Sequence, residues 1–139
     1  MKKFNLSILA AMLVFVFSVM DLSAQTRKSE QTKAWKQFQT AIARSDKTAV
    51  AVMIKFPFEA SIVGSNLDYK IEMKADFIKN YALIFTKNRR EIIVRGKYEP
   101  IADEDEFNFE MNDDSRGTHV FRFRKIGGVY YLVGTIGVG

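Results

Sequence analysis

Cysteine is absent from the sequence, and histidine occurs once, as His119. Without cysteine the chain forms no disulfide and offers no thiolate for nucleophilic catalysis, for a zinc site or for an iron-sulfur cluster. A single imidazole also excludes the histidine-rich kind of metal site. We therefore expect no resident metal ion and no cofactor, so any chemistry has to rest on carboxylates, hydroxyls, amines or His119.

Long apolar runs are also scarce, and the one that occurs, Leu6–Met20, is shorter than the roughly 20 residues that span a bilayer. Two lysines precede it and the small residue Ala24 follows, which is the pattern of a secretory signal peptide. We predict a signal peptide at residues 1–24, export to the periplasm or out of the cell, and one domain at residues 25–139 with no stable membrane span. An uncleaved anchor is the alternative, whereas the lipoprotein route needs a cysteine.

Charge is distributed unevenly along the chain, although the net charge is only +5. The stretch Glu99–Asp114 holds eight acidic residues and no basic one, so the remainder is strongly basic. A nucleic-acid-binding protein needs a basic stripe with interleaved aromatic residues, so we expect no nucleic-acid partner. Phe107 and Phe109 interrupt the acidic stretch, and Gly117 comes too late for a calcium-binding loop. We interpret the stretch as a solvated loop and strand edge. The alternative is that its carboxylates guide a basic partner or pair with Lys87, Arg89 and Arg90.

Apolar residues recur at helical spacing in three segments. The first helix is predicted at Thr26–Arg44 and the third at Lys74–Phe85. Between them, Asp46 is a good N-cap for a short helix, which has to end near Lys55 because the residue before Pro57 disfavours helical backbone. The apolar faces of the first and third helices hold Trp35, Phe38, Phe77, Tyr81 and Ile84.

Three further segments have the composition of strands. Phe58–Val63 is predicted as a short strand after the second helix, and Glu91–Arg95 (EIIVR) as another because it is rich in β-branched residues. Phe107, Phe109 and Met111 alternate with polar residues, as expected of a strand with one buried face.

The clearest element is a hairpin formed by His119–Ile126 and Val129–Ile136. They flank Gly127-Gly128, and a two-residue hairpin turn favours glycine because both positions need positive φ. A register with Ile126 opposite Val129 pairs, on the core side, Phe123 with Leu132, Phe121 with Gly134 and His119 with Ile136. The opposite, half-apolar face then carries Arg122, Arg124, Tyr131 and Val133. We predict that this outer face is the interface of a homodimer.

Three N-terminal helices packed on a curved antiparallel sheet that ends in a long β-hairpin is an α+β arrangement. It resembles the cone-shaped fold of the nuclear transport factor 2-like (cystatin-like) superfamily. The segments that carry the resemblance are Trp35–Val50, the helix motif FIKNY at Phe77–Tyr81, and the closing hairpin at Phe121–Val133. The superfamily holds isomerases, dehydratases, polyketide cyclases and binding modules, so the resemblance implies a fold and leaves the function open.

The resemblance argues against one activity of the superfamily, ketosteroid isomerisation. Alignment on Asp46 places Phe38 where that enzyme has its oxyanion-stabilising tyrosine and puts Ile62 near the position of its basic aspartate. Neither side chain can move a proton. His119 remains a weak candidate for a catalytic acid or base. The groups that could act with it are Tyr81, Tyr69 and Asp76.

The aromatic residues of the cone admit two interpretations. They either line a pocket for a small apolar ligand or fill the core. The predicted pocket residues are Trp35, Phe38, Phe77, Tyr81, His119, Phe121 and Phe123. Two hypotheses for the function follow. The first, which we favour, is an exported non-enzymatic module that binds a small apolar ligand or a protein partner. The second is an acid-base enzyme of the isomerase, dehydratase or cyclase type that uses His119 in the pocket.

Overall fold

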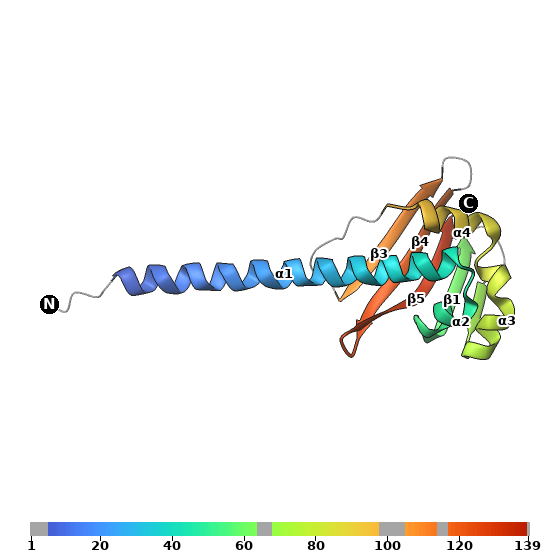
Figure 1. The fold of residues 1–139 in the computed structure, drawn as a ribbon, viewed down its shortest axis with the longest axis horizontal. Coiled ribbons are helices and arrows are strands. Elements are labelled where there is room, and N and C mark those ends of the chain that lie inside the picture. Colours follow the sequence, from blue (N-terminus) through green and yellow to red (C-terminus); the bar gives the residue numbers. More distant parts are fainter. Residues whose placement is uncertain (1–5, 64–67, 98–104, 114–116, 139) are drawn as a thin grey trace.

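The computed structural model describes residues 6–63, 68–97, 105–113 and 117–138. The bounds of the elements are α1 Leu6–Ala43, α2 Lys47–Val52, β1 Ile54–Val63, β2 Asp68–Ile71, α3 Lys74–Ile84, α4 Lys87–Arg95, β3 Glu106–Asp113, β4 Gly117–Ile126 and β5 Val129–Val138. Figure 1 shows the helices packed on one side of a curved sheet. The predicted α+β cone that closes with a long hairpin is therefore confirmed.

The described strands form one mixed sheet in the order β2-β1-β5-β4-β3. β1 pairs in parallel with β5, and the other neighbouring strands are antiparallel. This differs from the wholly antiparallel sheet that we predicted. After β2 the chain crosses through α3 and α4 to the far edge of the sheet, and the closing hairpin then brings β5 back beside β1 in the same direction.

The segment Glu91–Arg95 was predicted as a strand, and this prediction is wrong, because the segment forms the second half of α4. Thr86 caps the start of this helix by accepting a hydrogen bond from the Arg89 backbone N–H. At the other end, Nε2 of Gln39 on α1 donates to the carbonyl oxygens of Ile93 and Gly96 at 2.9 and 2.8 Å. Contacts at both ends thus override the strand propensity of the β-branched residues.

The hairpin turn is confirmed, with φ of 58° at Gly127 and 84° at Gly128. The predicted register holds from Ile126 opposite Val129 to Phe123 opposite Leu132. Beyond that point a β-bulge shifts the pairing by one residue, so the predicted pairs are replaced by Arg122 with Gly134, Phe121 with Thr135 and His119 with Gly137. At the bulge the backbone N–H of Leu132 donates to the Met53 carbonyl oxygen at 2.8 Å, which joins β5 to the end of α2.

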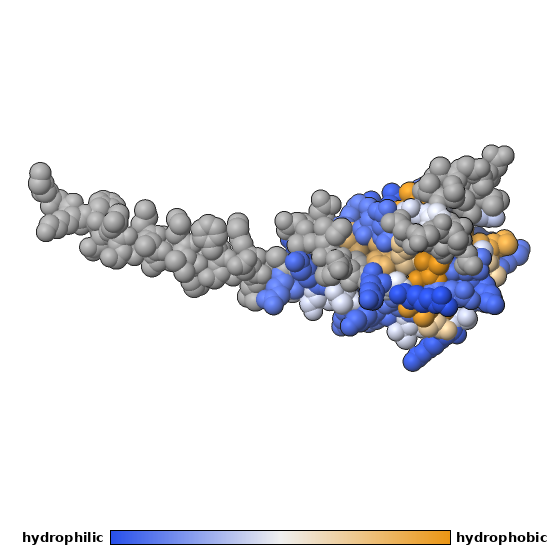
Figure 2. All heavy atoms as spheres, turned by 90° about the horizontal axis from the view of Figure 1, so that it is seen from above, coloured by the Kyte–Doolittle hydropathy of each residue, from blue (hydrophilic) through white to orange (hydrophobic). Residues whose placement is uncertain are grey.

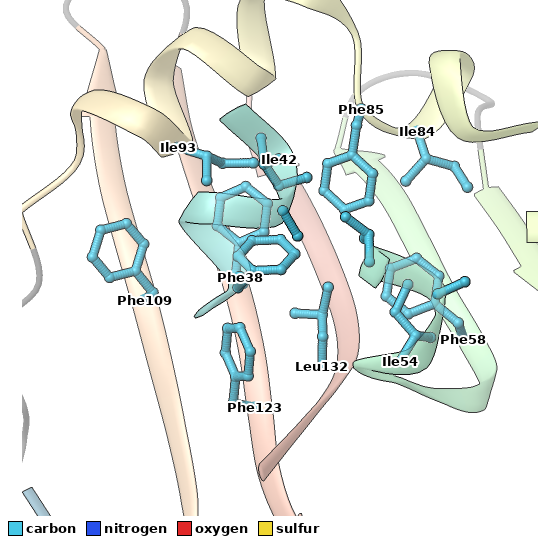
Figure 3. Close-up of a cluster of buried hydrophobic side chains, with 14 of the residues drawn as sticks. Phe38, Ile42, Ile54, Phe58, Ile84, Phe85, Ile93, Phe109, Phe123 and Leu132 are labelled. Atoms are coloured by element: carbon cyan, nitrogen blue, oxygen red, sulfur yellow. The ribbon is translucent and has the colours of Figure 1, made fainter. Parts of the chain in front are cut away.

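The core lies between the helices and the inner face of the sheet (Figure 3). Phe38 from α1 stands at its centre and faces Phe109, Phe123 and Leu132 from the strands. The indole of Trp35 stacks on the Phe109 ring with centroids 3.6 Å apart, and the Phe107 and Phe123 rings stack at 4.9 Å. Hydrophilic side chains surround a smaller apolar area on the described surface in Figure 2.

The predicted cap of α2 is confirmed and leads to a test. Asp46 accepts a hydrogen bond from the Ala49 backbone N–H through Oδ1 at 2.9 Å. Replacing Asp46 with alanine leaves that donor without its cap, so we expect the free energy of unfolding to fall by about 1 kcal/mol. Chemical denaturation measures this loss. Thr48→Ala, at an exposed position of the same helix, should change the midpoint far less, and an equal loss in both variants would contradict the capping role.

Candidate functional site

The predicted pocket residues occupy the core. Six of them, Trp35, Phe38, Phe77, Tyr81, Phe121 and Phe123, are each at most 2% exposed. Their rings contact one another and the rings of neighbouring residues, as in the edge-to-face pair of Phe77 and Tyr81 at 5.9 Å. The ring of Phe38 lies near the rings of four described residues, at centroid distances from 5.6 to 6.2 Å. Two of these pairs are edge-to-face and two are tilted. In the described structure these side chains therefore pack against each other as a core does.

His119 lies half-buried on β4, opposite Met111 on β3 and Gly137 on β5. Tyr81 belongs to the aromatic core, and burial raises the pKa of its phenol, which opposes ionisation. Asp76 is exposed on α3, and Tyr69 lies on β2 opposite Ala60. The structure brings His119 near Arg89 of α4, a residue that the sequence analysis considered only as an ion-pair partner of the acidic stretch.

Of the residues of the predicted interface, Arg122, Arg124 and Tyr131 alternate with core residues and lie on the outer face of the sheet. Val133 is the unpaired residue of the β-bulge, so the predicted pair of Arg122 with Val133 is wrong. Arg124 forms an ion pair with Glu106 of β3, in the adjacent strand. Arg122 lies over Gly134, since a Cβ built on that glycine would be 3.1 Å from Nη2 of Arg122. Tyr131 and Val133 are half-buried. The face is thus partly apolar and carries charges of both signs, and the homodimer remains a prediction.

An open groove with a volume of about 780 Å³ lies on the helical side of the molecule. Its lining residues are Lys28, Ser29, Thr32, Lys33, Lys36, Gln37, Thr40, Ala41, Arg44, Asp46, Ala49 and Met53. Those from α1, together with Arg44 just after its end, form two adjacent rows at four-residue spacing, one from Lys28 to Arg44 and one from Ser29 to Ala41. At 1.5 Å per residue the longer row measures about 24 Å. Ala49 and Met53 form the other side.

The groove combines positive charge with an apolar floor. Its lining holds four basic side chains and one acidic one, Asp46, while Ala41, Ala49 and Met53 supply apolar surface. The hydroxyls of Thr32 and Thr40 each donate to the carbonyl oxygen four residues earlier at 2.8 Å. These hydroxyl oxygens therefore remain acceptors, beside the ammonium donors of the lysines. The lining suits a molecule that is anionic on its edges and apolar in the middle.

Sequence reasoning missed this groove, although part of its signal is present. Lys28, Thr32, Lys36, Thr40 and Arg44 repeat at every fourth residue and mark one polar face of the predicted first helix. Such a face is ordinarily solvated, and what makes it one side of a groove is the packing of α2 alongside α1. That packing depends on tertiary structure.

The described residues show neither a metal-binding cluster nor a membrane span. No three side chains of the kinds that ligate metals gather there. In the same part of the chain, no helix combines the length and the apolar character that a membrane crossing needs.

Neither a protein-family model nor a curated protein sequence matches the chain significantly. Solved structures do match it. A nuclear transport factor 2-like protein of unknown function from Pseudomonas putida shares 12% identity at a TM-score of 0.53, over 81% of this chain and 85% of that one. A protein of unknown function with a cystatin-like fold from Nostoc punctiforme shares 17% identity at a TM-score of 0.51, over 80% of this chain and 89% of that one. The chain therefore has the nuclear transport factor 2-like, cystatin-like fold.

Proposed function

We propose that this protein is an exported, non-enzymatic binding module that recognises a protein partner through the groove between α1 and α2. The partner segment is acidic and partly apolar. The observation that carries the proposal is the lining of the groove, with four basic side chains around an apolar floor. The filled core supports a protein partner over a small apolar ligand, since the side chains first considered for a ligand pocket pack against one another.

The shape of the groove supports a chain segment as its occupant. A compact ligand is usually enclosed on most sides, whereas this groove is open and extends for about 24 Å along α1. An amphipathic helix of about four turns has this length and presents one apolar stripe. Its acidic residues would then lie beside Lys28, Lys33 and Lys36, and its apolar stripe would cover Ala41 and Met53.

Export of the module rests on the sequence pattern at residues 1–24. Cell fractionation tests this part of the proposal independently of the groove, because an exported chain leaves the cytoplasm whether or not the groove binds a partner. Retention of the protein in the cytoplasm would contradict export alone.

Charge reversal in the groove is the test of binding. The probe is a fluorescein-labelled 16-residue peptide with leucine at i, i+3, i+4 and i+7, four glutamates beside this apolar stripe and alanine elsewhere, so that it can form an amphipathic helix; binding is measured by fluorescence anisotropy. We expect the Lys33→Glu/Lys36→Glu variant to bind it about 10- to 100-fold more weakly than the wild type, because both lysines line the groove and attraction becomes repulsion.

The matched control is Lys74→Glu/Lys79→Glu, which makes the same change of net charge at exposed positions of α3 outside the groove lining. This control should bind within about threefold of the wild type, since distant exposed charges are screened by salt. A peptide with lysine in place of glutamate should not bind. Equal weakening in the two double variants, or no binding of the acidic peptide by the wild type, would overturn the proposal.

A further inference from the structure

Arg89 stands out because, among the residues that the structure describes, it is the one charged side chain that is buried, with 6% of its surface exposed. It lies in the first half of α4, and its side chain points toward β5. Arginine is seldom buried without a partner, since removing a guanidinium from water is strongly unfavourable. An anion bound next to this buried cation would therefore stabilise it.

Within the described part of the chain, the guanidinium of Arg89 donates one side-chain hydrogen bond. Its Nη1 donates to the carbonyl oxygen of Ile84 at 2.9 Å, at the negative end of the α3 dipole. That bond uses one of the several N–H donors of the guanidinium. No carboxylate of the described residues forms an ion pair with it. Burial lowers the pKa of Arg89.

The hairpin of β4 and β5 lies beside the guanidinium of Arg89. A Cβ built on Gly137 would lie 2.7 Å from Nη2 of Arg89 and 3.4 Å from Nδ1 of His119. Glycine at this position thus allows the guanidinium and the imidazole to approach the same point of β5. His119 and its neighbour Thr118 are half-buried, so this end of the sheet is partly exposed to solvent beside the guanidinium.

We propose that Arg89, with His119 as the adjacent wall, forms a binding site for an oxyanion group, either a carboxylate or a phosphate carried by a small molecule, where α4 meets β4 and β5. The planar guanidinium matches both groups, because it can donate two parallel N–H bonds to two oxygens of the same group. The oxygens of the bound anion accept hydrogen bonds from Arg89 in place of the water that the guanidinium lost on folding. This site is separate from the groove, whose lining contains neither residue.

The test is the thermal unfolding midpoint of the purified protein in sodium phosphate, in sodium acetate and in sodium chloride at equal ionic strength. We expect phosphate or acetate to raise the wild-type midpoint above its value in chloride, by about 5 °C at ten times the dissociation constant. A response to phosphate alone assigns a phosphate group, and a response to acetate alone assigns a carboxylate. A response to both assigns an oxyanion site open to either group.

Variants of α4 connect the response to Arg89. Arg89→Met removes the charge and retains the length of the side chain, so the oxyanion response should vanish. Arg95→Met, at an exposed position of the same helix, should keep it. Arg89→Lys retains a positive charge but lacks the planar guanidinium that donates two parallel hydrogen bonds. This variant keeps the proposal testable if Arg89→Met does not fold. We expect it to bind at least tenfold more weakly in the same titration.

Two results would overturn the assignment. One is a wild-type midpoint that depends only on ionic strength, which would mean that the buried guanidinium takes up no oxyanion. The other is the same oxyanion response in wild type and Arg89→Met, which would mean that the anions act elsewhere on the molecule. Neither result bears on the peptide-binding groove.

Discussion

Replacing Phe38 with alanine should lower the free energy of unfolding by about 3–5 kcal/mol. The side chain is fully buried, and its ring contacts those of Trp35, Phe85, Phe121 and Phe123. Alanine removes both the burial of the ring and its contacts with these neighbours, and the cavity left behind closes only in part. Since a domain of this size is stable by about 5–15 kcal/mol, the loss is a large share of the total.

Chemical denaturation of the wild type and the variant measures this loss. Leu83→Ala is the matched control, because Leu83 is 58% exposed on α3, and its truncation should change stability by about 0.5 kcal/mol or less. The result also separates the two interpretations of the aromatic cone. Had Phe38 lined an open ligand pocket, its truncation would enlarge a space already present and would destabilise the protein little. A loss below about 1 kcal/mol would therefore contradict the filled core.

The sequence predicts best the elements that are fixed by their own residues. Asp46 caps α2 through a backbone amide three residues away, and Gly127-Gly128 supplies the positive φ of the hairpin turn. Both features are local, so the chain encodes them within a few positions. The bulge near Leu132 is different, because it coincides with a backbone hydrogen bond from Leu132 to Met53, about eighty residues away in the chain. No pattern within β5 reveals that contact.

The candidate sites were harder to predict for a related reason. Aromatic residue type suggested a pocket, but whether rings such as Trp35 and Phe109 line a space or fill it depends on how closely they pack. Arg89 belongs to the charged segment KNRRE at residues 87–91, and a charged segment of this kind ordinarily indicates a solvated helix face or turn. Its burial follows from the way α4 lies on the end of the sheet, opposite Gly137. The sequence offers no signal for that arrangement.

The segment Glu91–Arg95 provides the sharpest test of the fold, because a strand and a helix bury different side chains there. In α4, Ile93 lies four residues after Arg89 on the inward face and is fully buried, whereas Val94 is 45% exposed. In a strand, Ile93 would share a face with the charged residues Glu91 and Arg95, and Val94 would lie on the apolar face. In a helix, a charged substitution at Ile93 therefore destabilises the protein more than one at Val94, and in a strand the order is reversed.

We expect Ile93→Asp to destabilise the protein by about 4 kcal/mol or more, and at ordinary temperature to leave much of it unfolded. The substitution removes a buried apolar side chain and puts a carboxylate into the core beside Phe38 and Ile42. Attraction to Arg89, four residues earlier on the same face, offsets only part of the cost of taking this charge out of water. Val94→Asp should change stability by about 1 kcal/mol or less, because the new charge stays in water. Circular dichroism and denaturant midpoints measure both. Greater damage from Val94→Asp than from Ile93→Asp would mean that this segment is a strand, and the position of Arg89 in the oxyanion site would fall with α4.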